Sequence, residues 1–369
     1  MDSPLDSRIV RSSPSSCLGP RHNLGWLLVV VIILSGTVFT FVSLRNLHFK
    51  QKAEAVSAVA SNTPAHIVAG LDSVLKIDPN NVSALIAKSD VLAQQASIKA
   101  STEDAVQAVI SVERAIALDP NNSSAYRILG YANEVQQNYP EAHAAYEKAI
   151  ALDPKNVGAL VGDARIYDAL GDTKSAEAGY AVVLAKHPEL FAVRLTLARI
   201  EYFVDKTPDV ALGNFRTVYT NSKNAHERAE AAYGIGTILL SQNKYETAYQ
   251  YMSDATTIDS KYASGWLGLG TAQYLRAVAS TTLPVNTRAN AVISSEETLK
   301  KAVSLDQNLS HAYYELAVVM KAMGQKDLAL STLATAGIVV SKDSTLTASE
   351  RDTLAKQISG LVASLQKAK

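Results

Sequence analysis

The sequence predicts an all-α fold built from repeated pairs of helices. Apolar residues recur at the spacing of one helical face, in short segments separated by turns. In the middle of the chain the whole arrangement returns after 34 residues, at turns that carry Pro120, Pro154 and Pro188. A constant period of this length is typical of stacked repeats, because one helix pair cannot bury its apolar face alone.

The first helix of the clearest repeat is expected to begin near Ser123. Its residues at the i, i+3, i+4 and i+7 positions share one face, and a glycine among them leaves room for a neighbouring helix. These residues are Tyr126, Leu129, Gly130 and Asn133.

A second helix should begin at Pro140, since proline is tolerated in the first helical turn. It should end at Leu152-Asp153-Pro154, because the residue before a proline is disfavoured in the helical conformation. Its inward positions are Ala142, Tyr146 and Ala149.

This pattern of a bulky residue, Leu-Gly, then Ala, an aromatic, Ala and Pro resembles the tetratricopeptide repeat, although Asn133 stands where that family usually has an aromatic. The resemblance implies a right-handed superhelical solenoid of helix-turn-helix repeats. The alternative is an ordinary helical bundle with accidental periodicity. The recurring Asp-Pro turns and the constant period favour the repeats.

The turns place the solenoid at residues 64–346, as a half repeat followed by about seven repeats. Three repeats have 34 residues, one has 38, and two have 41 and 47. We expect the extra residues of the two longest repeats between their helices, near residues 94–101 and 280–287. A capping helix is expected at 347–369, where Thr347 and Glu350 form a capping-box pattern.

A membrane anchor is predicted before the repeats. Residues 24–44 contain no charge over 21 positions, enough for a helix across a bilayer core of about 30 Å. We expect a disordered tail at 1–20 and a connector at 45–63. A cleaved signal peptide is the alternative, but its apolar region is normally shorter, and the basic residues Arg45, Lys50 and Lys52 follow this one.

The predicted localisation is therefore a single-pass membrane protein that contacts the lipid bilayer through residues 24–44. Basic residues are balanced on the two sides of the span, so charge does not decide its orientation. A short N-terminal tail most often stays in the cytoplasm. We therefore favour the arrangement with the repeats on the extracytoplasmic side.

Composition argues against several classes of function. Of 35 basic and 35 acidic side chains, six basic and two acidic precede residue 53, so the repeats are mildly acidic and nucleic acid is not expected as a partner. Cys17 is the single cysteine, and the seven histidines lack metal-ligand spacing. The glycine-rich stretch around Gly268 lies inside a predicted helix, unlike a phosphate-binding loop. We expect no cofactor, no metal and no enzymatic activity.

The resemblance also implies where a protein or peptide partner would bind, because the first helix of each pair lines the concave face in tetratricopeptide arrays. Arginines in register there would accept carboxylates, and tyrosines would give flat apolar contacts. The candidate partner-binding residues are Arg127, Tyr131, Arg165, Arg199, Tyr202, Tyr233, Tyr274 and Tyr314.

Internal pairing is the alternative role for these residues. The arginines would then bind Glu134, Asp168 or Glu201 of adjacent repeats, and the tyrosines would be half-packed. The family's clamp for chaperone C-termini is not expected, since Tyr131 stands where that clamp needs an asparagine.

The sequence thus predicts a membrane-anchored scaffold that binds protein partners and organises a complex at the membrane. The alternative is a regulatory or targeting subunit of a membrane-bound enzyme complex. An enzyme whose site is assembled from distant repeats is a third hypothesis.

Overall fold

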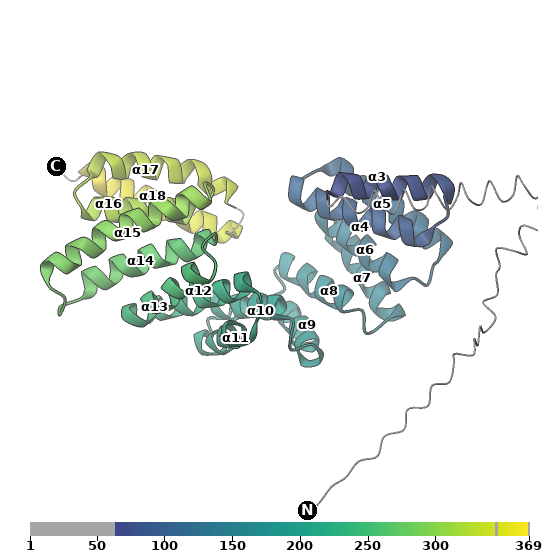
Figure 1. The fold of residues 1–369 in the computed structure, drawn as a ribbon, viewed down its shortest axis with the longest axis horizontal. Coiled ribbons are helices and arrows are strands. Elements are labelled where there is room, and N and C mark those ends of the chain that lie inside the picture. The colour runs from purple at the N-terminus through teal and green to yellow at the C-terminus, as the bar shows by residue number, and fades with distance from the viewer. Residues whose placement is uncertain (1–62, 344–345, 368–369) are drawn as a thin grey trace, which may run out of the picture. The chain divides into compact units, whose positions relative to one another are not determined.

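The computed structural model describes residues 63–343 and 346–367. In these residues the regular structure consists of sixteen α-helices, α3 to α18, and one 3-10 turn at Val340–Lys342, with no strand (Figure 1). None of these helices is both long and apolar enough to cross a membrane. The predicted tail at 1–20, the membrane helix at 24–44 and all of the connector except Thr63 lie outside the described residues.

The chain divides into two compact units between Pro120 and Asn121. In the first unit, α3 packs against α4, and α4 packs against α5. These helices are α3 (Pro64–Ile77), α4 (Val82–Lys99) and α5 (Thr102–Leu118).

The second unit consists of six antiparallel helix pairs and a final helix (Figure 1). Each first helix packs on its own second helix, and each second helix packs on the first helix of the next pair. The first helices are α6 (Ser123–Val135), α8 (Val157–Ala169), α10 (Phe191–Phe203), α12 (Ala225–Ser241), α14 (Ala263–Ala279) and α16 (Ser310–Ala322). The second helices are α7 (Tyr139–Leu152), α9 (Thr173–Lys186), α11 (Pro208–Asn221), α13 (Tyr245–Ile258), α15 (Val285–Leu305) and α17 (Lys326–Val339), and α18 (Ala348–Lys367) closes the unit.

Side chains at the turns fix the helix ends. Proline occupies the first turn of α7, and α7 ends at Leu152 with Asp153 as its C-cap, as the sequence predicts. Asparagine caps the N-termini of α6 and α8, where Asn122 and Asn156 accept hydrogen bonds from backbone N–H groups three residues on. These caps satisfy donors that a helix cannot pair internally.

The long repeats differ from the sequence expectation, because their extra residues extend helices rather than loops. Only Ala100 and Ser101 separate α4 from α5, and α4 has 18 residues. Residues 280–284 separate α14 from α15, which have 17 and 21 residues, against 13 and 14 in α6 and α7. The extra residues therefore lie near the predicted positions 94–101 and 280–287, but they mainly lengthen the helices there, and the prediction that they form a loop between the helices was wrong. Residues 94–99 contain no helix breaker, so α4 simply continues through them.

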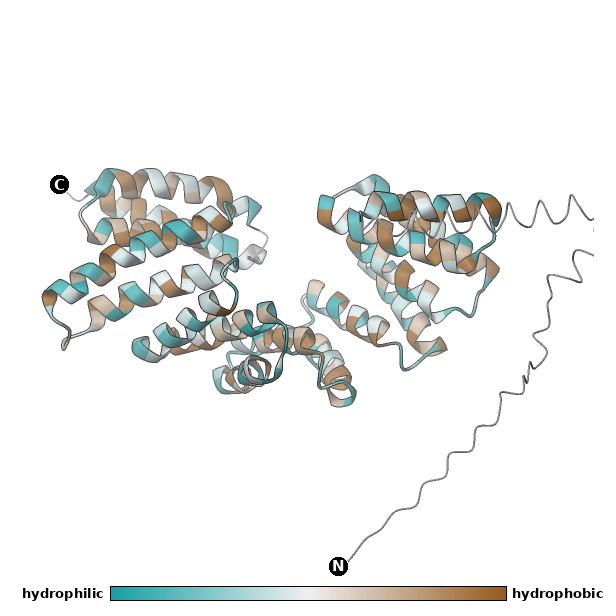
Figure 2. Cartoon of the chain, in the orientation of Figure 1, coloured by the Kyte–Doolittle hydropathy of each residue, from teal (hydrophilic) through white to brown (hydrophobic). Residues whose placement is uncertain are grey.

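The core of the second unit runs along the second helices. Each helix has an apolar face and a polar face, and the apolar faces meet between neighbours (Figure 2). The eighth residue of all second helices except α15 is almost fully buried. In these five helices this residue is Tyr146, Tyr180, Phe215, Met252 or Leu333, and in the longer α15 the corresponding fully buried residue is the fifteenth, Leu299.

The terminal helix α18 begins with the predicted capping box. The backbone N–H and hydroxyl of Thr347 donate to the Glu350 carboxylate at 2.7 and 2.8 Å, and the Glu350 N–H donates to the Thr347 hydroxyl at 3.3 Å. Leu354, Ile358 and Leu365 are buried with residues of α16 and α17. This helix thereby covers the apolar face of the last repeat.

Candidate partner-binding cavity

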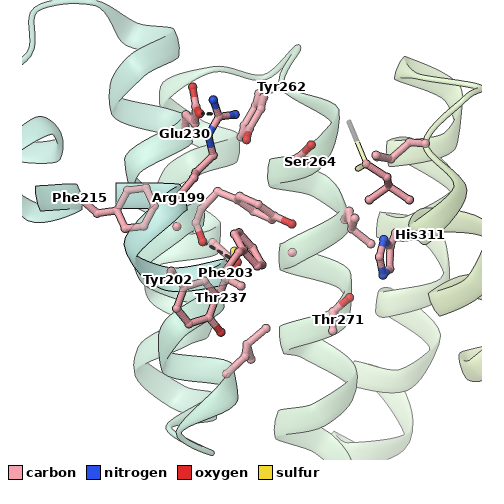
Figure 3. Close-up of a pocket in the computed structure, with 18 of the residues that line it drawn as sticks. Arg199, Tyr202, Phe203, Phe215, Glu230, Thr237, Tyr262, Ser264, Thr271 and His311 are labelled. Carbon is pink, nitrogen blue, oxygen red and sulfur yellow. Dashed lines mark hydrogen bonds and ion pairs between the residues drawn. The ribbon is translucent and has the colours of Figure 1, made fainter. Parts of the chain in front are cut away.

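A cavity of about 570 Å³ opens among the first helices of the second unit. Its walls come from α10, α12, α14 and α16, and from residues at the start of α18 (Figure 3). Figure 3 shows Arg199 and Tyr202 on one side, Ser264 and Thr271 on the middle helix, and His311 opposite. Its position on the first helices agrees with the expectation from the repeat pattern.

Small residues let the cavity form. Gly234 on α12 lies against the Phe215 ring, and a Cβ there would come within 2.6 Å of that ring. Gly268 on α14 lies against Met252 and Tyr233 in the same way. These glycines bring each first helix close to the preceding repeat, and the larger cavity residues then project into the open space.

One wall of the cavity is aromatic. The Tyr233 and Tyr262 rings meet edge to face at 5.9 Å, and His226 meets Tyr262 at 5.2 Å. Burial raises the pKa of both tyrosines, so their hydroxyls stay protonated at neutral pH. This wall offers flat apolar faces together with hydroxyl groups, a combination that is common in protein-binding surfaces.

Most charged groups of the cavity already have partners. Arg199 forms an ion pair with Glu230 at 3.5 Å, and the His226 Nδ1 lies 2.8 Å from an Asp259 oxygen. Burial lowers the pKa of His311, although Asp343 and Glu350 act in the opposite direction. His311 is therefore expected to be neutral at physiological pH.

Glu315 on α16 is the exception. It lines the cavity, and no residue in the described part of the chain forms a hydrogen bond or ion pair with it. The Glu315 side chain keeps some accessible surface, but protein atoms surround it. This burial alone raises the pKa of Glu315 to about 7. The cavity therefore holds a carboxyl group that titrates near neutral pH.

The structure brings three of the eight candidate residues together in the cavity, namely Arg199, Tyr202 and Tyr233. Tyr274 and Tyr314 pack against the core of the C-terminal repeats. The pKa of each is raised by burial and then by the Glu315 carboxylate, which places both tyrosines near that group.

The other three candidates, Arg127, Tyr131 and Arg165, lie on α6 and α8 and do not line the cavity. Arg165 forms the internal ion pair with Glu134 that the alternative predicted, and its guanidinium lies 6.0 Å from the centre of the Tyr131 ring. Arg199 is paired as well, but with Glu230 rather than with a predicted partner.

Sequence reasoning missed Glu315, Glu230 and Tyr262. A signal for Glu315 was present, because the 47-residue repeat aligns it with Gly268 on the preceding first helix. A carboxylate in place of a glycine at a helix contact is an anomaly in a repeat. Tyr262 lies in the turn before α14, outside the helical positions that the repeat pattern identifies.

The stacked helix pairs of the described residues form a helical-repeat fold similar to that of tetratricopeptide-repeat proteins. Residues 94–157, 136–200 and 229–262 each match a tetratricopeptide-repeat family model. The described part of the chain is thus an all-α, tetratricopeptide-like repeat structure. No curated protein matches the sequence significantly.

Solved structures agree on the fold. A chain of the APC/C hetero-tetramer Cut9-Hcn1 is 15% identical, with a TM-score of 0.54 over 83% of this chain and 54% of that one, so this chain spans about half its length. A tetratricopeptide repeat protein from Parabacteroides merdae is 16% identical, with a TM-score of 0.52 over 73% of this chain and 98% of that one. At these identities the similarity is one of fold.

Proposed function

We propose that the chain is a protein-binding scaffold whose partner inserts a segment into the cavity on the first helices. The observation that carries this proposal is the cavity itself, with an aromatic wall whose tyrosines the chain's own side chains cover only in part. A concave site with apolar walls and a few placed polar groups is the usual form of a binding site. The tetratricopeptide-like fold supports a protein as the ligand.

We further propose that residues 24–44 anchor this scaffold in a membrane, with the repeats on the extracytoplasmic side. The length of the uncharged stretch supports the anchor. Proteolysis of sealed vesicles of known orientation tests both points. External protease is expected to digest the repeats of an extracytoplasmic domain without lysis. Release of the intact chain by alkaline carbonate would instead contradict the anchor.

No catalytic role is part of the proposal. Several polar groups of the cavity are engaged by the chain itself, for example Arg199 by Glu230 and His226 by Asp259. Covalent catalysis would need a nucleophile beside a base, and no hydrogen bond joins such a pair among the described cavity residues. Binding without turnover is therefore the activity that this arrangement favours.

Site-specific photocrosslinking in cells tests the binding function. A photoreactive benzoylphenylalanine at Thr271, on the cavity floor, is compared with the same group at Thr257, which is exposed on α13. A crosslinked protein at position 271 and none at position 257 is the expected result. Equal crosslinking at both positions, or none at either, would count against the cavity as the binding site.

A further inference from the structure

The carboxylates of the cavity outnumber its cations. Glu230, Glu315 and Glu350 line the cavity, and Arg199 is the single lysine or arginine among its described lining residues. Arg199 is already engaged by Glu230 at 3.5 Å. The cavity therefore presents an excess of negative charge to whatever enters it.

Glu315 is the carboxylate that carries this excess. Glu350 accepts two hydrogen bonds from Thr347, so its charge stabilises the start of α18. Glu315 has no such partner among the described residues, and burial opposes its ionisation. A group that costs folding free energy without serving a structural contact is a candidate for ligand binding.

Tyrosine rings line the same cavity as this carboxylate. Tyr233 on α12 and Tyr262 in the turn before α14 line the cavity together with Glu315. The Glu315 charge contributes to the raised pKa of Tyr233, and also of Tyr274 and Tyr314, after burial in each case. Rings in the same cavity as a carboxylate suit a cation with an apolar stem, because the stem packs on the rings while the charge meets the carboxylate.

We propose that Glu315 is the counter-charge for a lysine or arginine side chain of the partner segment, which inserts into the cavity with its aliphatic stem against the tyrosines. This inference rests on the proposed function and specifies the chemistry of the partner at the same site. A basic side chain pairs the one unpartnered carboxylate, and charge complementarity of this kind gives specificity.

An acidic partner segment, which the register of arginines suggested, fits this cavity poorly. Arg199 could bind it only by releasing Glu230, and Glu315 would then repel it. In this proposal the arginines of the repeat array therefore have a structural role, and the negative charge of Glu315 selects the partner segment.

Selection of peptides on the purified full-length chain in detergent tests the inference. Phage-displayed random decapeptides serve as the probe, on the wild type, on Glu315→Gln and on the control Glu297→Gln, an exposed residue of α15. We expect peptides with a lysine or arginine flanked by apolar residues from the wild type and the control, and loss of the basic residue with Glu315→Gln. Acidic or uncharged peptides from the wild type, or the same basic peptides from Glu315→Gln, would overturn the inference.

The affinity of a selected peptide gives the decisive number. Replacing its basic residue with norleucine, which keeps the apolar stem, should weaken binding to the wild type by roughly tenfold or more. The same replacement should change the affinity for Glu315→Gln by no more than about twofold. If no peptide is selected at all, the proposed protein-binding function fails together with the inference. If peptides bind but ignore this charge, only the inference fails.

Discussion

Arg165 holds Glu134 through two parallel hydrogen bonds that join neighbouring repeats. Its Nε and Nη2 lie 2.5 and 2.6 Å from the two carboxylate oxygens, and the Tyr146 hydroxyl donates to the same carboxylate at 2.8 Å. Burial and then the Glu134 charge raise the pKa of Tyr146, so this hydroxyl remains a donor. One carboxylate therefore connects α6, α7 and α8.

Removing this carboxylate should destabilise the second unit. We expect Glu134→Gln to lower the free energy of unfolding by about 1–3 kcal/mol, because the Arg165 charge and the buried Tyr146 hydroxyl lose a charged acceptor. Urea denaturation of Glu134→Gln, Arg165→Met and the double variant measures the coupling free energy between the two residues, which we expect to be about 1 kcal/mol. Arg216 lies at an exposed position, so the changes in the free energy of unfolding caused by Glu134→Gln and Arg216→Met should be additive. Zero coupling with Arg165→Met would show that the pair contributes nothing to folding.

Glycines that contact the Tyr146 ring give a second prediction. Gly130 and Gly162 lie against this ring, and a Cβ on Gly130 would come within 2.7 Å of it. Because the buried ring cannot move aside, we expect Gly162→Ala to reduce stability by about 1–3 kcal/mol. Gly213→Ala is the matched control. It lies on α11 with no atom within 4 Å of an added Cβ, so it should stabilise the chain by about 0.5–1 kcal/mol. Thermal shifts of the same sign for both variants would contradict the packing described here.

The unpartnered Glu315 should cost stability at neutral and alkaline pH. Its pKa is about 7 in the folded chain against an ordinary value of 4.5, so the folded state binds more protons between these two values. The free energy of unfolding then falls as pH rises from about 4.5 to about 7, and stays constant above that. At about pH 8 we expect Glu315→Gln to be more stable than the wild type by on the order of 2 kcal/mol, less than the full linkage value because the group faces an open cavity.

Measuring the free energy of unfolding at several pH values separates the titration of Glu315 from an effect of the substitution that does not depend on pH. The advantage of Glu315→Gln should shrink toward zero near about pH 4.5, where Glu315 is protonated in the folded chain. Glu297→Gln, at an exposed position, should show no such trend. An advantage that is equal at all pH values would mean that the carboxyl does not titrate as the structure indicates.

Binding of a basic segment should be linked to the same proton. A bound cation lowers the pKa of Glu315, so affinity is expected to be constant above about pH 7 and to fall by up to tenfold per pH unit below it. The other charged or titratable groups that line the cavity are Arg199, Tyr202, His226, Glu230, Tyr233, Tyr262, His311 and Glu350, and the Glu315 charge also acts on Tyr274 and Tyr314. Titration calorimetry between about pH 5.5 and 8.5 measures the pH dependence of the affinity, which should be absent in Glu315→Gln. A dependence that survives the substitution would assign it to another of these groups.

Much of the fold follows from local sequence signals. The apolar period, the proline turns and the capping box at Thr347 each involve residues close in the chain, and each has the predicted geometry. Gly130 was recognised as a contact glycine for the same reason. The extended helices α4 and α15 were missed because a long loop and a longer helix give the same repeat length.

The site was less predictable, because it depends on which side chains meet between repeats. Tyr202, Tyr233 and Arg199 follow from their place on the first helices. The pairing of Arg199 with Glu230, however, depends on reach across two helices. Glu315 was missed because a single glutamate next to Tyr314 is typical of a solvated helix face, and its alignment with Gly268 does not by itself show that the carboxylate lacks a partner in the folded chain.

Filling the cavity tests the central claim most directly. Thr271→Trp places a large ring in the cavity, and Thr257→Trp places the same ring on the exposed surface of α13. The measurement is the amount of crosslink-identified partner that each full-length variant retains in a pull-down at equal protein levels. We predict that Thr271→Trp loses the partner and that Thr257→Trp keeps it at the wild-type level. Full retention by a folded Thr271→Trp variant would show that the partner binds elsewhere and would contradict the account.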